Sequence, residues 1–281
     1  MTGSYAIIFK VTTLVAVAAL AGCGGSNDGS ATNPITEVND GLTILKTYSD
    51  GSGFVGFRQT VNGTQYSGTI LGGDVATTSY ASFGTANLDN VVSIQSTAKG
   101  EYSSAIATID NVQRQVYVYE ANNGEASYMV GDSCIGPCIG AYGVAPTDIP
   151  SGTWVYSGDF IALGEGGNLS DSETGTFTMS ANFTSETADF SASSPNGKLV
   201  FSSNNATINT STGTFNGTGS AISPGSAGGS GNEWDIDLYG SFHGAGATSV
   251  SGVASSNLQT VTGPDNLVGH VNGAFAGSLT P

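Results

Sequence analysis

The amino-acid sequence predicts an all-β fold, in which a small antiparallel β subdomain precedes an eight-stranded antiparallel β-barrel. Three observations favour this fold. Glycine accounts for 42 of the 281 residues, about twice the usual ~7%. After residue 40, no segment has the apolar period of an amphipathic helix. Short segments of alternating apolar and polar residues recur instead, between turns of Gly, Asn, Asp and Ser, as in β-sandwiches and barrels.

The first 22 residues have the pattern of a bacterial lipoprotein signal peptide. An apolar run from Val11 to Leu20 ends in Ala21-Gly22, and Cys23 follows directly. A short apolar run before small residues is a secretory signal rather than a membrane span. We therefore expect cleavage before Cys23 and acylation of its thiol, each buried CH₂ of the acyl chains contributing ~0.8 kcal/mol of membrane affinity. An ordinary secretory signal with a chance cysteine is the alternative.

The expected mature chain has three parts. Residues 23–40 are rich in Gly, Ser, Asn and Asp and predict a flexible tether. Residues 41–150 form the β-rich subdomain and residues 151–281 the barrel, with the proline-containing stretch from Ser133 to Ser151 as the boundary. Because Gly24, rather than Asp, follows the cysteine, we expect the protein to be lipid-anchored in the outer membrane and exposed on the cell surface.

Six alternating segments predict the strands of the first subdomain. The last two predict a β-hairpin, in which Tyr102–Ile109 and Arg114–Tyr119 are joined through Asp110-Asn111. The six segments are Leu42–Tyr48, Gly53–Thr60, Gln65–Leu71, Val91–Thr97, Ser103–Ile109 and Gln113–Tyr119.

Eight further segments predict the barrel. In Thr176–Phe183 every second residue is apolar and those between are polar, and Asp235–Phe242 repeats the pattern, which indicates one buried face and one wet face. Eight strands that close on themselves leave an interior about wide enough for side chains. The segments are Thr153–Leu163, Gly175–Phe183, Ala188–Ser193, Lys198–Ile208, Gly213–Ile222, Glu233–Phe242, Ser249–Ser255 and Gly269–Leu279.

A membrane-spanning barrel is the alternative for this half of the chain. It needs an apolar belt facing the lipid, with girdles of aromatic residues. The glycine-rich, aromatic-poor strands and the acylated cysteine, which makes spanning strands redundant as an anchor, argue against it.

The chain is strongly acidic, with 22 Asp and Glu against 6 Lys and Arg and a formal net charge of −16. Loss of Lys10 with the signal peptide would leave five basic residues, scattered singly along the chain. Nucleic-acid binding requires clustered Lys and Arg, so we expect no nucleic-acid partner. The same charge opposes contact with anionic headgroups, so the acyl chains should be the only link to the membrane.

The two remaining cysteines, Cys134 and Cys138, enclose Ile-Gly-Pro. An exported protein matures in an oxidising compartment, and Gly-Pro suits a tight turn that brings the two thiols together. We predict a disulfide between them. A metal site is a poor alternative, because two thiolates without a nearby His or third Cys fall short of a tetrahedral ligand set.

The sequence offers little support for an enzyme. The two histidines, His243 and His270, have no carboxylate or nucleophile at the spacing of a recognised catalytic motif, so no catalytic residue and no metal site is assigned. The simplest interpretation of each is a solvated loop histidine. A second hypothesis is that one of them ligates haem iron, for which imidazole is a common axial donor; haem is thus the one cofactor considered.

The segment Leu238–Gly252 resembles the signature of the transferrin-binding protein B barrel family, in which a strand ending Gly-x-Phe-Tyr-Gly leads through a short turn to a hydrophobic residue and Gly. Residues 152–158 and 273–275 are similar to the first and last barrel strands of that family, so the resemblance covers about residues 150 to 281. The matching signature residues are Gly240, Phe242, Gly244, Ala247, Val250 and Gly252.

The resemblance implies a lipid-anchored surface protein in which a β handle precedes an eight-stranded barrel. His243, Ala245 and Thr248-Ser249 depart from the family pattern, and the chain has room for one lobe where the transferrin-binding members have two. We expect Gly240 and Gly252 to permit strand bending and close backbone approach, and Phe242, Val250 and Phe275 to point into the core.

Three functions follow from these observations. The first is a non-enzymatic binding module on the outer-membrane surface, for an iron-related ligand (transferrin-like, or haem) or another macromolecule. The second is a structural envelope lipoprotein that holds no ligand and forms an acidic hydrated coat. The third is a hydrolase whose activity depends on His243 or His270.

Overall fold

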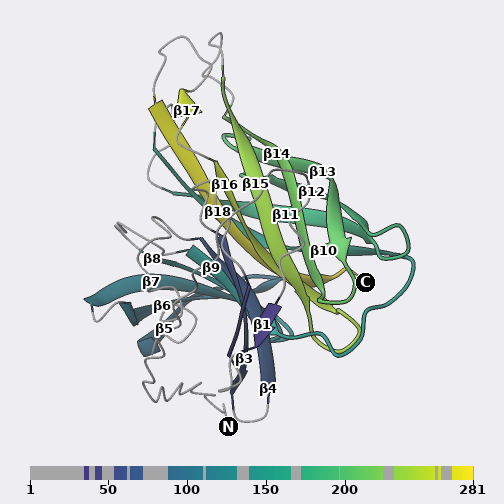
Figure 1. Ribbon diagram of the computed structural model, residues 1–281. Helices are drawn as coiled ribbons and strands as arrows, with labels where there is room; N and C mark the ends of the chain where they lie inside the picture. Colours follow the sequence, from purple (N-terminus) through teal and green to yellow (C-terminus); the bar gives the residue numbers. More distant parts are fainter. Residues whose placement is uncertain are drawn as a thin grey trace, which may run out of the picture.

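The computed structural model consists of two antiparallel β-sheets (Figure 1). It contains no helix among the residues it describes, and so none there that could cross a membrane. The described residues are 35–37, 42–45, 54–61, 64–71, 88–109, 112–131, 139–165, 172–195, 197–223, 231–256, 259–260 and 268–280.

The first sheet, called the handle below, has nine described strands in the order β1-β2-β3-β4-β9-β8-β7-β6-β5. Strand β5 lies at one edge. The strands are β1 (Ile35–Glu37), β2 (Leu42–Leu45), β3 (Phe54–Val61), β4 (Thr64–Leu71), β5 (Leu88–Ser96), β6 (Gly100–Ile109), β7 (Val112–Ala121), β8 (Ala126–Gly131) and β9 (Ile139–Val144).

The second sheet closes on itself through the pairing of its first strand with its last long strand, which makes an eight-stranded barrel. A short strand, β17 (Gln259–Thr260), pairs with the start of β18. The barrel strands are β10 (Thr153–Glu165), β11 (Glu173–Asn182), β12 (Thr187–Ser193), β13 (Val200–Asn209), β14 (Thr214–Ser223), β15 (Asn232–His243), β16 (Ser249–Ser256) and β18 (Val268–Leu279).

Alternation along the strands fills the barrel with aromatic rings. In β11, Phe177, Met179 and Ala181 are buried while the residues between them are exposed, as expected for side chains that alternate across a strand. Edge-to-face and tilted ring contacts cross the interior: the Phe242 ring centroid lies 4.8 Å from that of Phe183 and 5.3 Å from that of Phe215. The interior is therefore a packed core.

The all-β class and the eight barrel segments expected from the sequence are confirmed, with ends that differ by at most two residues. The hairpin of β6 and β7 is also present, with Ile109 opposite Val112. Three handle strands were not expected. Strand β1 lies inside the segment expected to be a tether, β9 lies inside the proline-containing boundary stretch, and β8 falls between two expected strands.

Cys23, Cys134 and Cys138 lie outside the described residues. Acylation of the first and a disulfide between the other two stay predictions.

Candidate functional site

The handle packs against the outer wall of the barrel, and this junction contains both buried apolar side chains and hydrogen-bonded polar groups. Small and aliphatic residues of the barrel wall, among them Ile161, Val253 and Ala276, are buried against handle residues such as Tyr128 and Val130. These wall residues occupy the outward positions of β10, β16 and β18. The two sheets therefore share a second core, separate from the barrel interior.

This packing corrects one expectation. The outward face of Asp235–Phe242 was expected to be wet, and Asp235 is indeed exposed. Further along the same strand, Ser241 is 2% exposed and Tyr239 packs against the junction core. The sequence alternation shows that a face is polar, but it does not show that a second sheet covers the face.

Three tyrosines of the handle form the centre of the junction. The rings of Tyr119 and Tyr128 stack with centroids 5.1 Å apart, and the ring centroid of Tyr102 lies 4.9 Å from that of Tyr119. The Tyr128 and Tyr102 hydroxyls are hydrogen-bonded at 3.2 Å. Burial raises the pKa of Tyr102 to about 12 and the pKa of Tyr128 well above its usual value, so both stay neutral at physiological pH.

Two charged residues, one from each sheet, lie beside these tyrosines. Asp159, which points outward from β10 and is buried by the handle, accepts a hydrogen bond of 2.9 Å from the Thr97 hydroxyl. Lys99, in the turn between β5 and β6, donates to the Ser157 hydroxyl at 2.6 Å. Burial raises the pKa of Asp159, while Thr97, Tyr119 and Lys99 act in the opposite direction.

The turn between β15 and β16, which carries the middle of the family signature, is held by the handle. The Gly244 N–H donates to the Val144 carbonyl at 2.9 Å. The carboxylate of Glu125 accepts hydrogen bonds from the hydroxyls of Thr248 and Ser249. A barrel hydroxyl, that of Tyr156, bonds the Ala247 carbonyl at 2.7 Å from the other side.

The signature residues therefore have two structural roles. Phe242 and Val250 are buried in the barrel core as expected, and so is Phe275. Gly244 and Ala247 adopt positive φ angles of 77° and 55°, which lets the turn fold against the handle.

His243 is not a solvated loop residue, and that interpretation was wrong. Its side chain is 0% exposed, and Nε2 lies 2.7 Å from the Ser251 Oγ. Burial lowers the pKa of His243 from 6.5 to about 3, although the Val144 backbone acts in the opposite direction. The ring is neutral at physiological pH and is enclosed by protein on the side that faces the handle.

His270 lies near the start of β18, opposite Glu165; its side chain is outside the described residues. His243 pairs with Ser249 of β16, and Ser249 pairs with Ser278, which lies near the other end of β18. The separation of eight positions from His270 to Ser278 corresponds to roughly 27 Å of strand, so the structure does not bring the two histidines together. The haem hypothesis stays a prediction.

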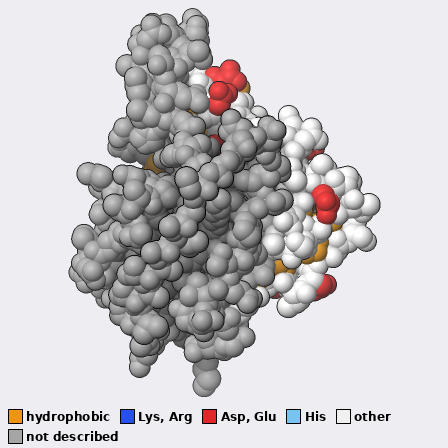
Figure 2. All heavy atoms as spheres, viewed as in Figure 1, with side chains coloured by type: hydrophobic (Ala, Val, Ile, Leu, Met, Phe, Trp, Pro, Cys, Tyr) orange, Lys and Arg blue, Asp and Glu red, His pale blue; other side chains and the backbone are white. Residues whose placement is uncertain are grey.

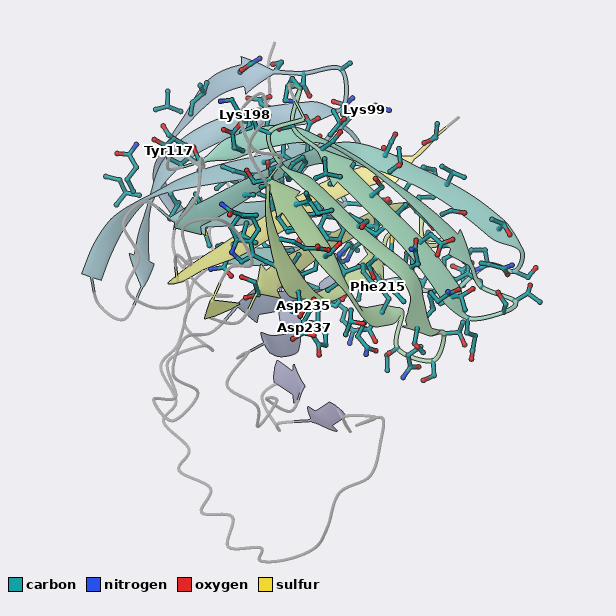
Figure 3. The ribbon with its side chains drawn as sticks, turned by 90° about the horizontal axis from the view of Figure 1, so that it is seen from above. Lys99, Tyr117, Lys198, Phe215, Asp235 and Asp237 are labelled. Carbon is teal, nitrogen blue, oxygen red and sulfur yellow. The ribbon has the colours of Figure 1, made fainter. Side chains whose placement is uncertain are left out.

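Exposed large apolar side chains are concentrated on one part of the handle. Val92 and Ile94 of edge strand β5 are 59% and 56% exposed, and Tyr117 of β7 is 39% exposed. We call these three residues the handle edge. Figure 3 shows Tyr117 on the handle sheet, and the register places it opposite Val130 of β8. Val155 and Ile222 on the barrel are the other two exposed large apolar residues of the described chain.

Uncharged and acidic groups make up the described part of the face shown in Figure 2. On the face shown in Figure 2, the described atoms are mostly backbone and uncharged polar side chains, with separate acidic groups and no Lys or Arg in view. Among the described residues, no group of three His, Cys, Asp or Glu side chains could hold a metal ion.

No protein-family model matches the chain, and a search of curated proteins found no match. Among solved structures, the chain is similar to a double mutant of Transferrin Binding Protein B, a vaccine antigen from Haemophilus parasuis Hp5, with 14% identity and a TM-score of 0.46 over 86% of this chain and 59% of that one.

It is also similar to the isotype 1 Transferrin binding protein B from serogroup B Neisseria meningitidis, with 11% identity and a TM-score of 0.45 over 85% of this chain and 65% of that one. The chain thus spans about 60% of the length of these two proteins. The architecture that the signature resemblance implied, a β handle followed by an eight-stranded barrel, is the one described above.

Proposed function

We propose that the chain is a lipid-anchored, non-enzymatic binding module on the outer-membrane surface, and that a macromolecular ligand docks on the handle edge. The observation that carries the proposal is the distribution of apolar side chains. In the part of the barrel that the structure describes, the interior is filled with its own aromatic rings, so these residues leave no ligand cavity comparable to that of a hollow barrel. Binding must then use the outer surface.

Three of the five exposed large apolar residues of the described chain lie on the handle edge. Grouped apolar side chains on an otherwise polar surface mark interaction sites. The acidity of the chain favours a ligand with basic groups. From the resemblance of the signature segment, transferrin-like and haem-carrying proteins are the first ligands to test.

The described residues also favour a binding function over catalysis. His243 is buried, neutral and bonded to Ser251, so it cannot exchange protons with a substrate at physiological pH. Asp159 and the neighbouring tyrosines are enclosed between the two sheets. These groups hold the handle on the barrel.

A capture experiment tests the ligand. The purified protein, its Val92→Ser/Ile94→Ser variant and a matched Val155→Ser/Ile222→Ser variant are immobilised and exposed to host serum and to spent growth medium. We expect the natural protein and the barrel variant to retain the same partner, and the handle variant to lose it. If no partner is retained reproducibly by the natural protein, the acidic coat is the better description. Equal retention by all three proteins would place the binding surface elsewhere.

A second experiment tests the anchor. Cells that express the natural protein or its Cys23→Ser variant are labelled with a clickable palmitate analogue and treated, intact, with an added protease. We expect label only in the natural protein and digestion of that protein without cell lysis. Absence of label would remove the acyl anchor. Protection from the protease would place the protein on the inner side of the outer membrane.

A further inference from the structure

His243 fills a gap in the handle rather than a place in the barrel core. It is the last residue of β15, and its side chain points outward from the barrel wall. A Cβ built on Gly143 of handle strand β9 would lie 2.7 Å from the His243 Cγ and 2.8 Å from its Nδ1. The glycine therefore leaves the space that the imidazole occupies, and the ring is inserted between the two sheets.

Apart from the Val144 backbone, the surroundings of the ring favour its neutral form. Nδ1 is buried without a hydrogen-bond partner, and so is the Oγ of Ser67, which lies opposite Gly143 in the handle. The Val144 carbonyl already accepts the Gly244 N–H. A second proton on the ring would place a buried cation among uncharged groups, which is costly.

The charged residues around the ring do not offset this cost. Glu125 lies beside Gly244, and its carboxylate already accepts hydrogen bonds from Thr248, Ser249 and Asn123. On the β4 side, Ser67 is opposite Arg58 of β3 in the register. Strands β9 and β16 present Gly143, Val144, Ser249 and Ser251, none of which titrates.

We propose that His243 is an acid-sensitive latch between the two sheets: the neutral ring holds the handle on the barrel wall, and protonation of the ring releases it. As the pH falls, we expect the handle to separate from the barrel before the barrel unfolds. The barrel closes through the β10–β18 pairing and has a core of its own. The handle is joined to β10 by one described segment, residues 145–152. The inference does not depend on the ligand or the lipid anchor.

The sign and size of the effect follow from proton linkage. The pKa of His243 is lowered in the docked state, so docking is favoured above the ordinary pKa of 6.5 and weakens as the pH falls towards about 3. Each pH unit in this window shifts the ratio of released to docked protein about tenfold. Asp159, at the other end of the junction, acts in the opposite direction because burial raises its pKa.

Hydroxyl-radical footprinting with mass spectrometry tests the latch, because the radical reacts over the whole pH range of interest. Tyr119 and Tyr128 are buried at the junction, whereas Trp234 and Phe177 are buried in the barrel. Between pH 6.5 and 5.0 we expect oxidation of the two tyrosines to rise about 15-fold, with Trp234 and Phe177 unchanged.

Two variants complete the test. His243→Gln keeps a polar atom near Nε2 but cannot be protonated, so the tyrosines should stay protected at both pH values. His270→Gln changes the only other histidine of the chain and should keep the natural response. A pH-independent footprint of the natural protein would overturn the latch, and so would simultaneous oxidation of Tyr119 and Trp234, or a His243→Gln variant that still responds.

If His243→Gln does not fold, an NMR titration of the two histidines in the natural protein decides. A ring that titrates near 6.5 while the handle remains docked would overturn the proposal.

Discussion

Gly240 and Gly252 lie directly opposite each other on β15 and β16, and a phenylalanine ring occupies the space beside each of them. A Cβ on Gly240 would lie 2.3 Å from Cζ of Phe215, and a Cβ on Gly252 would lie 2.5 Å from Cζ of Phe275. Figure 3 shows Phe215 on the barrel. The two glycines of the signature thus make room for the two rings that fill the barrel at this level.

We expect Gly252→Ala to destabilise the protein by roughly 1–3 kcal/mol, because overpacking a filled core forces rings and backbone to shift. The added Cβ would also approach the Tyr239 carbonyl at 2.5 Å, and a backbone atom cannot move as easily as a ring. Urea unfolding followed by Trp emission measures the change.

Gly273→Ala is the matched control in the same barrel. A Cβ there would have its closest neighbour at 3.4 Å, an ordinary contact, so we expect little change in stability. Equal losses for the two variants would show that the loss is a general cost of alanine in these strands rather than a packing conflict.

A second prediction concerns the hydrogen bond between His243 and Ser251. Ser251→Ala would leave Nε2 buried without a partner, and we expect a loss of about 1–3 kcal/mol at pH 7. Ser191→Ala, on the exposed face of β12, should be nearly neutral. Thermal and urea unfolding at neutral pH measure both. A nearly neutral Ser251→Ala would show that a water molecule or another group satisfies the ring.

The sequence predicted the barrel well because its strands follow one simple rule. Alternation in Thr176–Phe183 and Asp235–Phe242 reports which face meets the barrel core, and the eight segments were confirmed. The handle was predicted less completely. Strand β9 includes Gly140 and Gly143, lacks clear alternation, and comes just before Pro146, so local pattern alone indicated a boundary there.

The candidate site was largely hidden from the sequence. Tyr119 and Asp159 are separated by many residues of chain and meet only because the handle docks on β10. His243 was singled out as a residue, but its role was misjudged. The signal that could have corrected this is Gly143, which leaves the space for the ring, and no local pattern connects these two positions.

A third prediction concerns two like charges. Glu101 and Glu120 lie directly opposite each other on β6 and β7. The pKa of Glu120 is raised by partial burial and by the charge of Glu101. Because like charges in cross-strand pairs destabilise a sheet, we expect Glu101→Lys to raise stability by about 0.5 kcal/mol at pH 7 and low salt.

Glu173→Lys is the opposite control, since Glu173 forms an ion pair of 3.2 Å with Lys198, and its replacement should be neutral or slightly destabilising. Unfolding midpoints at two salt concentrations measure both changes, and the gain from Glu101→Lys should shrink at high salt. A loss of stability with Glu101→Lys would mean that the glutamate pair has a favourable partner.

The last prediction uses Asp159 to separate charge from hydrogen bonding at the junction. Its carboxylate accepts the Thr97 hydroxyl while it is buried between the sheets. Because burial raises its pKa in the folded protein, the charged form is disfavoured by folding. Asp159 therefore costs stability as the pH rises from its ordinary pKa of 3.8 through the raised value, and the cost is absent at lower pH.

Asp159→Asn keeps an oxygen for Thr97 but carries no charge at any pH. We expect the variant to be more stable than the natural protein at pH 7, because it carries no charge that burial disfavours. At pH 3.5 the two proteins should be nearly equal. Urea unfolding of both proteins at the two pH values gives the difference between their free energies of unfolding. The titration of His243 and of the other groups is common to both proteins and cancels in this difference. An Asn variant that is less stable at pH 7 would show that Lys99 stabilises the charge of Asp159. An ion pair between these two residues would then help to attach the handle to the barrel.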